Sequence, residues 1–340
     1  MNLFKSPACI VVAEISANHG QSLNRALEMI KRAKACGVDA VKFQAYTPDT
    51  LTIDASNKYF RVTHPEWGGQ TLYKLYTQAF TPWSWFKKLK RAASNEGLFF
   101  FSTAFDKTSV DFLEALGVPV HKIASFELVD IPLIEYTASK RKPLILSTGM
   151  ASLAEIKEAV RAARTHGAGK LMLLKCVSSY PAKPQEMNLR TIPDMRKRFK
   201  CAVGFSDHSL EFGASLAALT QGARLIEKHF TLSRKLKTPD SFFSLEPQEL
   251  KTFVTNLRIV EASLGNIHYG ATQDEKKSLA FRRSLFVIRD IRAGEAFNCN
   301  NIRSIRPGNG LAPKYLKTVL GSRAKVFLRR GTPLQKKHIR

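Results

Sequence analysis

Eight short apolar segments recur along the chain, separated by amphipathic or polar stretches, and this alternation constrains the fold more than any other feature. Apolar runs of about four to eight residues are typical of buried strands. Strands that alternate with helices indicate a parallel sheet. Eight such units within about 250 residues match a (β/α)₈ TIM barrel, so we predict an α/β fold of that kind. The predicted strands are residues 10–16, 40–46, 98–103, 120–125, 143–148, 171–176, 201–206 and 224–230.

The stretches between the predicted strands carry helix signals. Ser152 is followed three residues later by Glu155, which is the pattern of a capping box, and Gly167 fits the end of that helix. Residues 24–36 place their apolar side chains on one face, with Gly37 as the stop. These signals support the alternating pattern.

Two segments depart from that rhythm. Residues 47–76 form a long polar stretch after the second strand, which we expect to be an irregular functional loop or lid. After the last barrel helix the pattern changes to short strands and tight turns. We therefore predict a catalytic barrel over 1–265, a linker over 266–282 and a small β-rich domain over 283–340.

The chain is strongly basic, with 53 Lys and Arg against 28 Asp and Glu and a net charge of +25. Residues 283–340 hold 14 Lys or Arg against Asp290 and Glu295, a local net charge of +12. The simplest interpretation is a basic, solvated surface, but such a charge also suits polyanions in general or a small anionic substrate. Because no zinc-finger, RNP or helix-turn-helix signature accompanies it, we do not expect nucleic acid as a partner.

Cysteine usage and hydropathy indicate the compartment. The five cysteines are odd in number and show neither a CxxC pair nor zinc-ligand spacing, which favours reduced thiols. No apolar run is long enough to span a bilayer. We expect a cytoplasmic protein with no membrane association.

Two lysines stand inside otherwise apolar predicted strands. Lys42 lies in the second strand and Lys122 in the fourth. A buried lysine needs an anionic partner, and the active site of a (β/α)₈ barrel lies at the carboxyl ends of its strands. Together with the hydroxyl groups at the other strand ends, these lysines predict a ligand that carries phosphate and carboxylate.

Two histidines end adjacent predicted strands. His208 comes just after the seventh strand, and His229 lies near the end of the eighth. Imidazoles on neighbouring strands can converge on one metal ion, although each could instead be a hydrogen-bonded core histidine. Glu127 is a candidate acid/base near the same mouth, and its alternative role is an ion pair with Lys122.

These residues fall in motifs that resemble the sialic acid synthase family over nearly the whole chain. The resemblance implies a TIM barrel followed by an antifreeze-like (SAF) domain, in a domain-swapped homodimer whose small domain caps the partner's barrel. The motifs are AEISANH (13–19), VKFQ (41–44), FSTAF (101–105), KIASFE (122–127), LSTGM (146–150), FSDH (205–208), EKHF (227–230) and IRPGNG (305–310).

Within this family the chain most resembles the pseudaminic acid synthases, through YTPDTLT (46–52), LYKLY (72–76) and TPWSW (81–85). The implied reaction joins phosphoenolpyruvate to 2,4-diacetamido-2,4,6-trideoxy-L-altrose and releases phosphate by C–O cleavage. A different amino sugar, as in N-acetylneuraminate or legionaminate synthases, is the alternative. Another barrel that condenses phosphoenolpyruvate is a rival, but those enzymes lack a basic tail. A non-catalytic polyanion-binding protein is the remote alternative.

The resemblance also implies roles for individual residues. It places a divalent metal on His208 and His229, with Mn²⁺ favoured and Mg²⁺ or Co²⁺ as alternatives, and it makes Glu127 the catalytic carboxylate. The expected contacts of the sugar are Glu14, Tyr180, Asp240 and, from the partner's small domain, Arg306. The expected contacts of phosphoenolpyruvate are Lys42, Gln44, Thr103, Lys122, Ser125, Ser147, Ser178 and Ser206.

Overall fold

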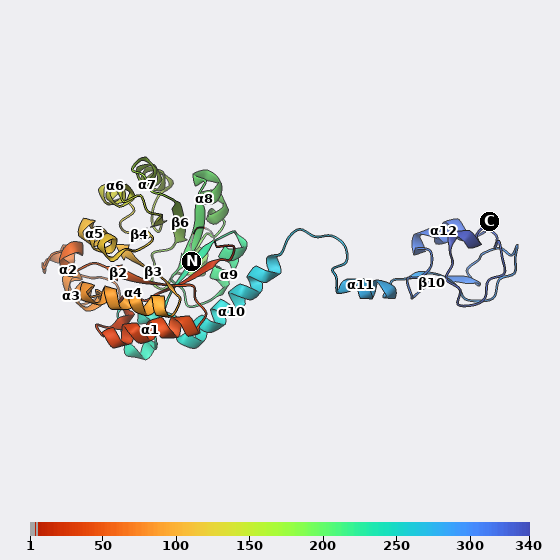
Figure 1. Cartoon of the computed structure of the whole chain (residues 1–340), viewed down its shortest axis with the longest axis horizontal. Coiled ribbons are helices and arrows are strands. Elements are labelled where there is room, and N and C mark those ends of the chain that lie inside the picture. The colour runs from red at the N-terminus through yellow and green to blue at the C-terminus, as the bar shows by residue number, and fades with distance from the viewer. Residues whose placement is uncertain (1–3, 5) are drawn as a thin grey trace. The chain divides into compact units, whose positions relative to one another are not determined.

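The computed structural model describes residue 4 and residues 6–340, and its contacts divide the chain into two compact units, Met1–Gly265 and Asn266–Arg340 (Figure 1). Each unit is considered by itself below. Within the described residues, no helix combines the length and apolar character needed to cross a bilayer.

The first unit is a closed barrel of eight parallel strands, which confirms the predicted fold class. Each strand pairs with the next in sequence, and β1 pairs with β8 to close the sheet. The predicted strands all form, with ends that shift by at most two residues. Their bounds are β1 Ile10–Glu14, β2 Ala40–Ala45, β3 Phe99–Ala104, β4 His121–Ile123, β5 Leu144–Ser147, β6 Leu171–Cys176, β7 Ala202–Asp207 and β8 Leu225–His229.

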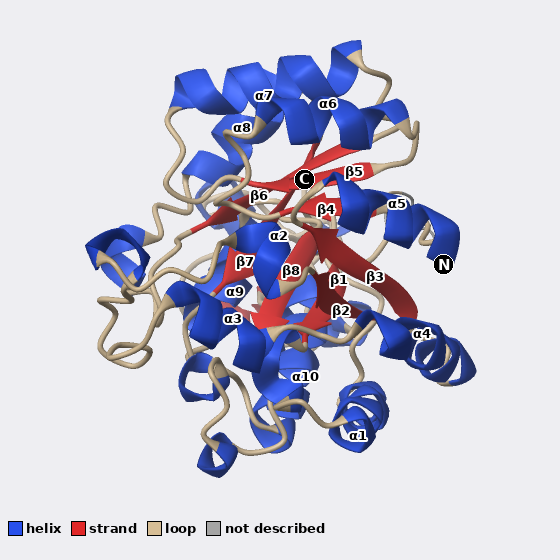
Figure 2. Ribbon diagram, turned by 90° about the vertical axis from the view of Figure 1, so that its left-hand side faces the viewer, coloured by secondary structure: helices blue, strands red, loops and turns tan. Residues whose placement is uncertain are grey.

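Helices surround the barrel (Figure 2). The predicted capping box starts α7, because Glu155 N donates to Ser152 Oγ (3.3 Å) and Ser152 N donates to Glu155 Oε2 (2.6 Å). The main helices are α1 Leu23–Ala35, α4 Phe86–Asn95, α5 Lys107–Leu116, α6 Ile131–Ser139, α7 Leu153–Thr165, α8 Thr191–Phe199, α9 Gly213–Thr220 and α10 Pro247–Leu264.

Two apolar clusters stabilise the barrel. The larger lies between the strands and the surrounding helices and includes Val41, Phe43 and Phe86. The smaller is formed by the alternate, inward-facing side chains, among them Val12 and Phe101. This inner layer closes the barrel interior beneath the polar carboxyl ends of the strands.

The segment 47–76 differs from the predicted irregular loop. It contains the short helix α2 (Pro48–Leu51) and the start of α3 (Leu72–Ala79), and Figure 2 shows both lying across one end of the barrel. The helix α3 forms because Thr71 Oγ1 accepts from Lys74 N (3.3 Å), while an apolar face buries Leu75. The helical spacing of these apolar residues is difficult to recognise in the sequence because tyrosines stand beside them.

The second unit holds one antiparallel pair, β9 (Ser284–Val287) with β10 (Ile302–Ile305). Other predicted strands appear only as isolated bridges, such as Ile291 with Leu328. Because the core is small, short bridged turns replace a full sheet. Residues 266–282, predicted to be a linker, contain α11 (Glu275–Ser278) and a 3₁₀ turn.

Candidate active site

Inward-facing positions become polar at the carboxyl ends of the strands. In β1, Val12 belongs to the inner apolar cluster, so Glu14 faces inward two residues later. In β8, Leu225 belongs to the same cluster, and Glu227 and His229 continue the series. The same alternation brings to this end the predicted residues Lys42, Gln44, Thr103, Lys122, Ser147 and Ser206.

Lys42 lies at the centre of a buried ionic cluster. Its Nζ is 2.5 Å from Glu14 Oε2 and 3.6 Å from Glu227 Oε1. It also donates a hydrogen bond to Thr103 Oγ1 (3.0 Å). Burial alone would lower the pKa of Lys42, but the carboxylates of Glu14 and Glu227 outweigh burial and raise it. Lys42 is therefore a cation at neutral pH.

Lys122 is less completely neutralised. Its Nζ donates to Ser147 Oγ (2.7 Å) and lies 3.9 Å from Glu227 Oε2, which accepts no hydrogen bond from any described residue. Burial lowers the pKa of Lys122. Ser206 Oγ donates to the other oxygen of Glu227 (3.2 Å). This arrangement leaves an ammonium group and hydroxyls at the end of a closed barrel.

Glu227 was not among the predicted site residues. Burial would raise the pKa of Glu227, but Lys122 and Lys42 outweigh burial and hold it below its usual value. The signal was present in the sequence, since a residue two positions before an inward-facing histidine must face the same side of the strand. Glu227 is the shared counter-ion of both predicted lysines.

The two predicted imidazoles lie close together in an edge-to-face arrangement, with ring centroids 5.2 Å apart and ring planes at 75°. His208 Nδ1 lies 2.8 Å from the carbonyl oxygen of Val177, which can only accept, so Nδ1 carries the proton and Nε2, which lies 3.4 Å from Ser206 Oγ, keeps its lone pair. His229 Nδ1 lies 3.3 Å from Ser16 Oγ. Burial lowers the pKa of His208 to about 4 and holds that of His229 well below its usual value. Both rings are neutral at pH 7, as metal coordination requires.

Asp207 and Lys228 occupy the opposite face of the same two strands. They form a fully buried ion pair at 3.1 Å, and Lys228 also donates to the carbonyl of Ser209. The hydroxyls of Ser209 (2.7 Å) and Ser215 (2.6 Å) donate to Asp207. This network fixes the ends of β7 and β8, which carry the two imidazoles.

A second group of hydroxyls surrounds Gly149. The backbone N–H of Gly149 donates to Ser125 Oγ (3.1 Å). The thiol of Cys176 lies 3.4 Å from Ser125 Oγ and 3.9 Å from Ser178 Oγ. A Cβ at residue 149 would overlap Ser178 Oγ and stand 2.9 Å from Ser125 Oγ. Only glycine at this position leaves both predicted serines in place.

A cavity of about 400 Å³ opens above these groups, and we call it the reaction cavity. Its polar lining includes five predicted residues, whereas the segment 51–79 supplies an apolar wall. The predicted residues are Gln44, Glu127, Tyr180, His229 and Asp240. The wall contains Leu51, Val62, Trp67, Leu72, Leu75, Tyr76 and Ala79.

Glu127 has the environment of an acid/base. Burial raises its pKa from 4.5 to about 7, and its buried Oε2 has no hydrogen-bond partner within the described chain. The alternative ion pair with Lys122 is not formed among the described residues, because Lys122 instead contacts Glu227 and Ser147. Glu127 can therefore exchange a proton near neutral pH.

The remaining predicted sugar contacts are divided between the two units. Tyr180 stacks on His208 with ring centroids 4.5 Å apart. Asp240 Oδ2 accepts from Ala17 N (3.3 Å), and burial raises its pKa. Glu14 lies deeper, where Gln44 Nε2 donates to its Oε1 (3.1 Å). Arg306, by contrast, belongs to the second unit, exposed directly after β10.

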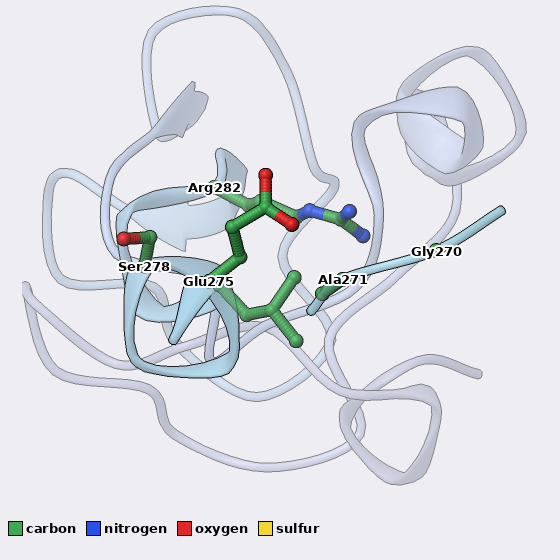
Figure 3. A pocket seen from close by; sticks show the side chains of 6 residues that line it. Gly270, Ala271, Glu275, Ser278 and Arg282 are labelled. Carbon is green, nitrogen blue, oxygen red and sulfur yellow. The ribbon is translucent and has the colours of Figure 1, made fainter. Parts of the chain in front are cut away.

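The second unit has its own shallow pocket of about 390 Å³ (Figure 3). Glu275 and Arg282 line it together with small or apolar residues of the same stretch. None of the predicted site residues lies there.

The comparisons with known proteins agree along most of the chain. Residues 29–269 match the model of the NeuB family and residues 282–340 that of the SAF domain. A pseudaminic acid synthase of Campylobacter jejuni is 39 % identical over 325 residues, covering 96 % of this chain and 95 % of that protein. One of Helicobacter pylori is 41 % identical over 325 residues, with 95 % and 96 % covered. The structure of an N-acetylneuraminic acid synthetase from Leptospira borgpetersenii superposes with a TM-score of 0.71 at 33 % identity, covering 80 % of this chain and 90 % of that one.

Proposed function

The chain belongs to the NeuB family, and on that premise we propose that it is a pseudaminic acid synthase, a transferase that condenses phosphoenolpyruvate with 2,4-diacetamido-2,4,6-trideoxy-L-altrose and water. Three relatives of that name are 38–41 % identical over almost the whole chain. A legionaminate-type relative from Legionella pneumophila stands at 36 %. The difference favours the pseudaminate sugar over the legionaminate one.

The observation that carries the proposal is the buried cationic cluster beneath the reaction cavity. Lys42 and Lys122 share one carboxylate, Glu227, at the carboxyl ends of the barrel strands. Buried lysines with converging hydroxyls suit a small ligand with phosphate and carboxylate groups. We assign Thr103 and Ser147, which bond these lysines, to the same ligand, with Gln44, Ser125, Ser178 and Ser206 around them.

The wall of the reaction cavity suits the proposed sugar. A 2,4-diacetamido-2,4,6-trideoxy hexose carries three methyl groups, whereas N-acetylhexosamines carry one methyl and more hydroxyls. Leu72 and Leu75 of α3, with Trp67, offer apolar surface for such methyls. Asp240 and Tyr180, which line the same cavity, would accept hydrogen bonds from the sugar hydroxyls and donate them to the sugar oxygens.

The two neutral imidazoles fit a divalent cation that takes its other ligands from water and substrate. Within the described chain, no group of three or more His, Cys, Asp or Glu residues is arranged to hold a metal alone. His208 and His229 would therefore hold Mn²⁺, or Mg²⁺ or Co²⁺, at an open site. Such an ion, when bound, supplies Lewis-acid polarisation of the sugar aldehyde.

The side chains of the barrel account for the remaining steps. Lys42 and Lys122 hold the enol phosphate so that its carbon faces the aldehyde, and a new C–C bond forms. Water then adds to the carbon that bears the phosphate, and phosphate leaves with C–O cleavage. Glu127, with a pKa of about 7, takes a proton from that water or gives one to the new alkoxide.

The deciding experiment measures phosphate release from phosphoenolpyruvate with a panel of amino sugars. The panel contains 2,4-diacetamido-2,4,6-trideoxy-L-altrose and the sugars that lead to legionaminate and N-acetylneuraminate. We expect the first to give the highest kcat/KM. A higher value with another sugar would reassign the substrate, and release with none would remove the enzymatic proposal.

We also propose a domain-swapped homodimer in the cytoplasm, in which Arg306 acts on the partner's barrel. The five cysteines, all within the described chain, are free thiols, which suits a reducing compartment. Mixing inactive Arg306→Ala with inactive His229→Ala chains tests the exchange. If Arg306 acts across the dimer, random exchange restores about a quarter of wild-type activity, because half the dimers hold one intact site of two. No recovery in dimers shown to have exchanged would exclude it.

A further inference from the structure

Residues 61–71 form a compact loop that is closed by its own hydrogen bonds. Its two ends pair in an antiparallel bridge, and Val62 N donates to the carbonyl of Gln70 (3.0 Å). Inside the loop, Trp67 N donates to the carbonyl of His64 (3.2 Å), and Gln70 Nε2 donates to the carbonyl of Trp67 (3.2 Å). The loop therefore has a defined shape of its own.

Trp67 fastens this loop to the barrel. Its indole N–H donates to the carbonyl of Pro239 (2.5 Å), in the segment after β8. The indole also contacts three rings outside the loop, with centroids at 5.7 Å for Tyr180, 5.8 Å for Phe242 and 6.4 Å for Phe243. None of residues 61–71 is fully buried, so few other contacts hold the loop down.

The indole is one ring away from each candidate metal ligand. Tyr180 contacts Trp67 on one side and stacks on His208 on the other (4.5 Å). Phe243 contacts Trp67 and packs on His229 (4.7 Å). A change in the position of Trp67 would therefore alter the packing around the two imidazoles, where the sugar aldehyde must lie under the proposed function.

Trp67 also separates two cavities. Beside the reaction cavity lies a second one of about 440 Å³, which we call the outer chamber. The two share Trp67, Leu75 and Pro239 in their linings. The outer chamber is otherwise rich in polar groups, such as Gln70 and Gln78. The three shared residues form the partition, and the indole is its largest side chain.

We propose that Trp67 is a specificity-determining residue, whose indole sets the maximum size of the N-acyl group that the sugar can carry. The inference deepens the proposed synthase function and rests on it. An acetamido methyl packs against the closed partition, whereas a longer acyl chain meets the indole. Without the indole, the two cavities join and the longer chain gains room in the outer chamber.

The test compares Trp67→Ala and Trp67→Phe with wild type, using sugars with N-acetyl or N-butanoyl groups. Trp67→Ala raises the KM for the acetyl sugar about tenfold or more, since lost apolar contact in a pocket is worth about 10- to 200-fold. The same variant shifts the butanoyl-to-acetyl ratio of kcat/KM by at least about tenfold toward butanoyl. Trp67→Phe keeps a ring in the partition but loses the bond to Pro239, so it raises the KM without that shift. The KM for phosphoenolpyruvate stays within about twofold in both variants.

The control is Tyr59→Ala, which removes another aromatic side chain before the loop. Tyr59 is 78 % exposed and lines neither cavity. Its loss therefore leaves unchanged both the KM for the acetyl sugar and the butanoyl-to-acetyl ratio of kcat/KM. The proposal is overturned if Trp67→Ala keeps the wild-type butanoyl-to-acetyl ratio of kcat/KM. It is also overturned if the KM for phosphoenolpyruvate rises as much as the KM for the acetyl sugar. Should Trp67→Ala not fold, Trp67→Leu provides the same comparison. Wild-type chain that releases no phosphate with any amino sugar would instead refute the synthase function itself.

Discussion

Replacement of Glu127 by Gln should make the stability of the protein less dependent on pH. Burial raises the pKa of Glu127 from 4.5 to about 7, and its buried Oε2 has no hydrogen-bond partner among residue 4 and residues 6–340. The folded state therefore holds this proton more tightly than the unfolded state does. Below pH 4.5 both states are protonated. As pH rises from 4.5 through 7 the unfolded state loses its proton first, so the free energy of unfolding falls.

The size of the effect follows from the shift. A difference from 4.5 to about 7, at about 1.4 kcal/mol per unit, corresponds to a loss of at most about 3.5 kcal/mol by pH 8. The amide side chain of the Glu127→Gln variant has no proton to lose, so this loss is absent from it. The variant should gain up to about 3 kcal/mol relative to wild type between pH 5 and pH 8.

Urea unfolding of both proteins at half-unit pH steps measures this difference directly. Other titrating groups cancel, because they are present in both chains. Parallel stability curves for the two proteins from pH 5 to pH 8 would refute the reasoning. Activity should change in the opposite sense: the limb of the kcat profile near pH 7 disappears in the variant, and kcat falls by about 10²- to 10⁴-fold.

Three further predictions concern the site and its support. Gly149→Ala should raise the KM for phosphoenolpyruvate at least about tenfold by displacing the hydroxyl of Ser178, and an unchanged KM would contradict the role of that serine. Lys228→Met should cost about 3–5 kcal/mol in urea unfolding because it leaves Asp207 buried and unpaired, and the double change with Asp207→Leu should recover most of it. His229→Ala should lose turnover at every Mn²⁺ concentration and weaken Mn²⁺ binding, measured by calorimetry, while its far-UV circular dichroism stays native. An active His229→Ala enzyme would remove the metal assignment.

Much of the barrel could be predicted because its strands are short apolar runs bounded by polar residues. Each predicted strand corresponds to an observed one, and the capping box at Ser152 forms as expected. Motif resemblance then identified the family, which the match over residues 29–269 confirms. Local pattern and motif order are sufficient to predict a strand that is buried on both of its faces.

The sequence was less informative where side chains meet across distant segments. Glu227 was not predicted as a site residue because its role as a counter-ion depends on two lysines from β2 and β4, which only closure of the barrel brings together. The helix α3 was not predicted because its apolar face is short and interrupted by tyrosines. The partition formed by Trp67 depends on a bond to Pro239, 172 residues away. The alternation in β8 indicates that Glu227 faces inward, but no local pattern shows which distant side chains such residues contact.

The alternation of inward-facing side chains also bears on how this scaffold could acquire new chemistry. The polar positions of the mouth, such as Lys122 and Ser147, stand two residues beyond the inner apolar positions, such as Val120 and Ile145. That step is about 7 Å along a strand. A mutant library confined to the polar positions of the mouth would sample new substrates while the inner apolar layer keeps the sheet closed. The same randomisation two residues earlier would produce mostly unfolded chains.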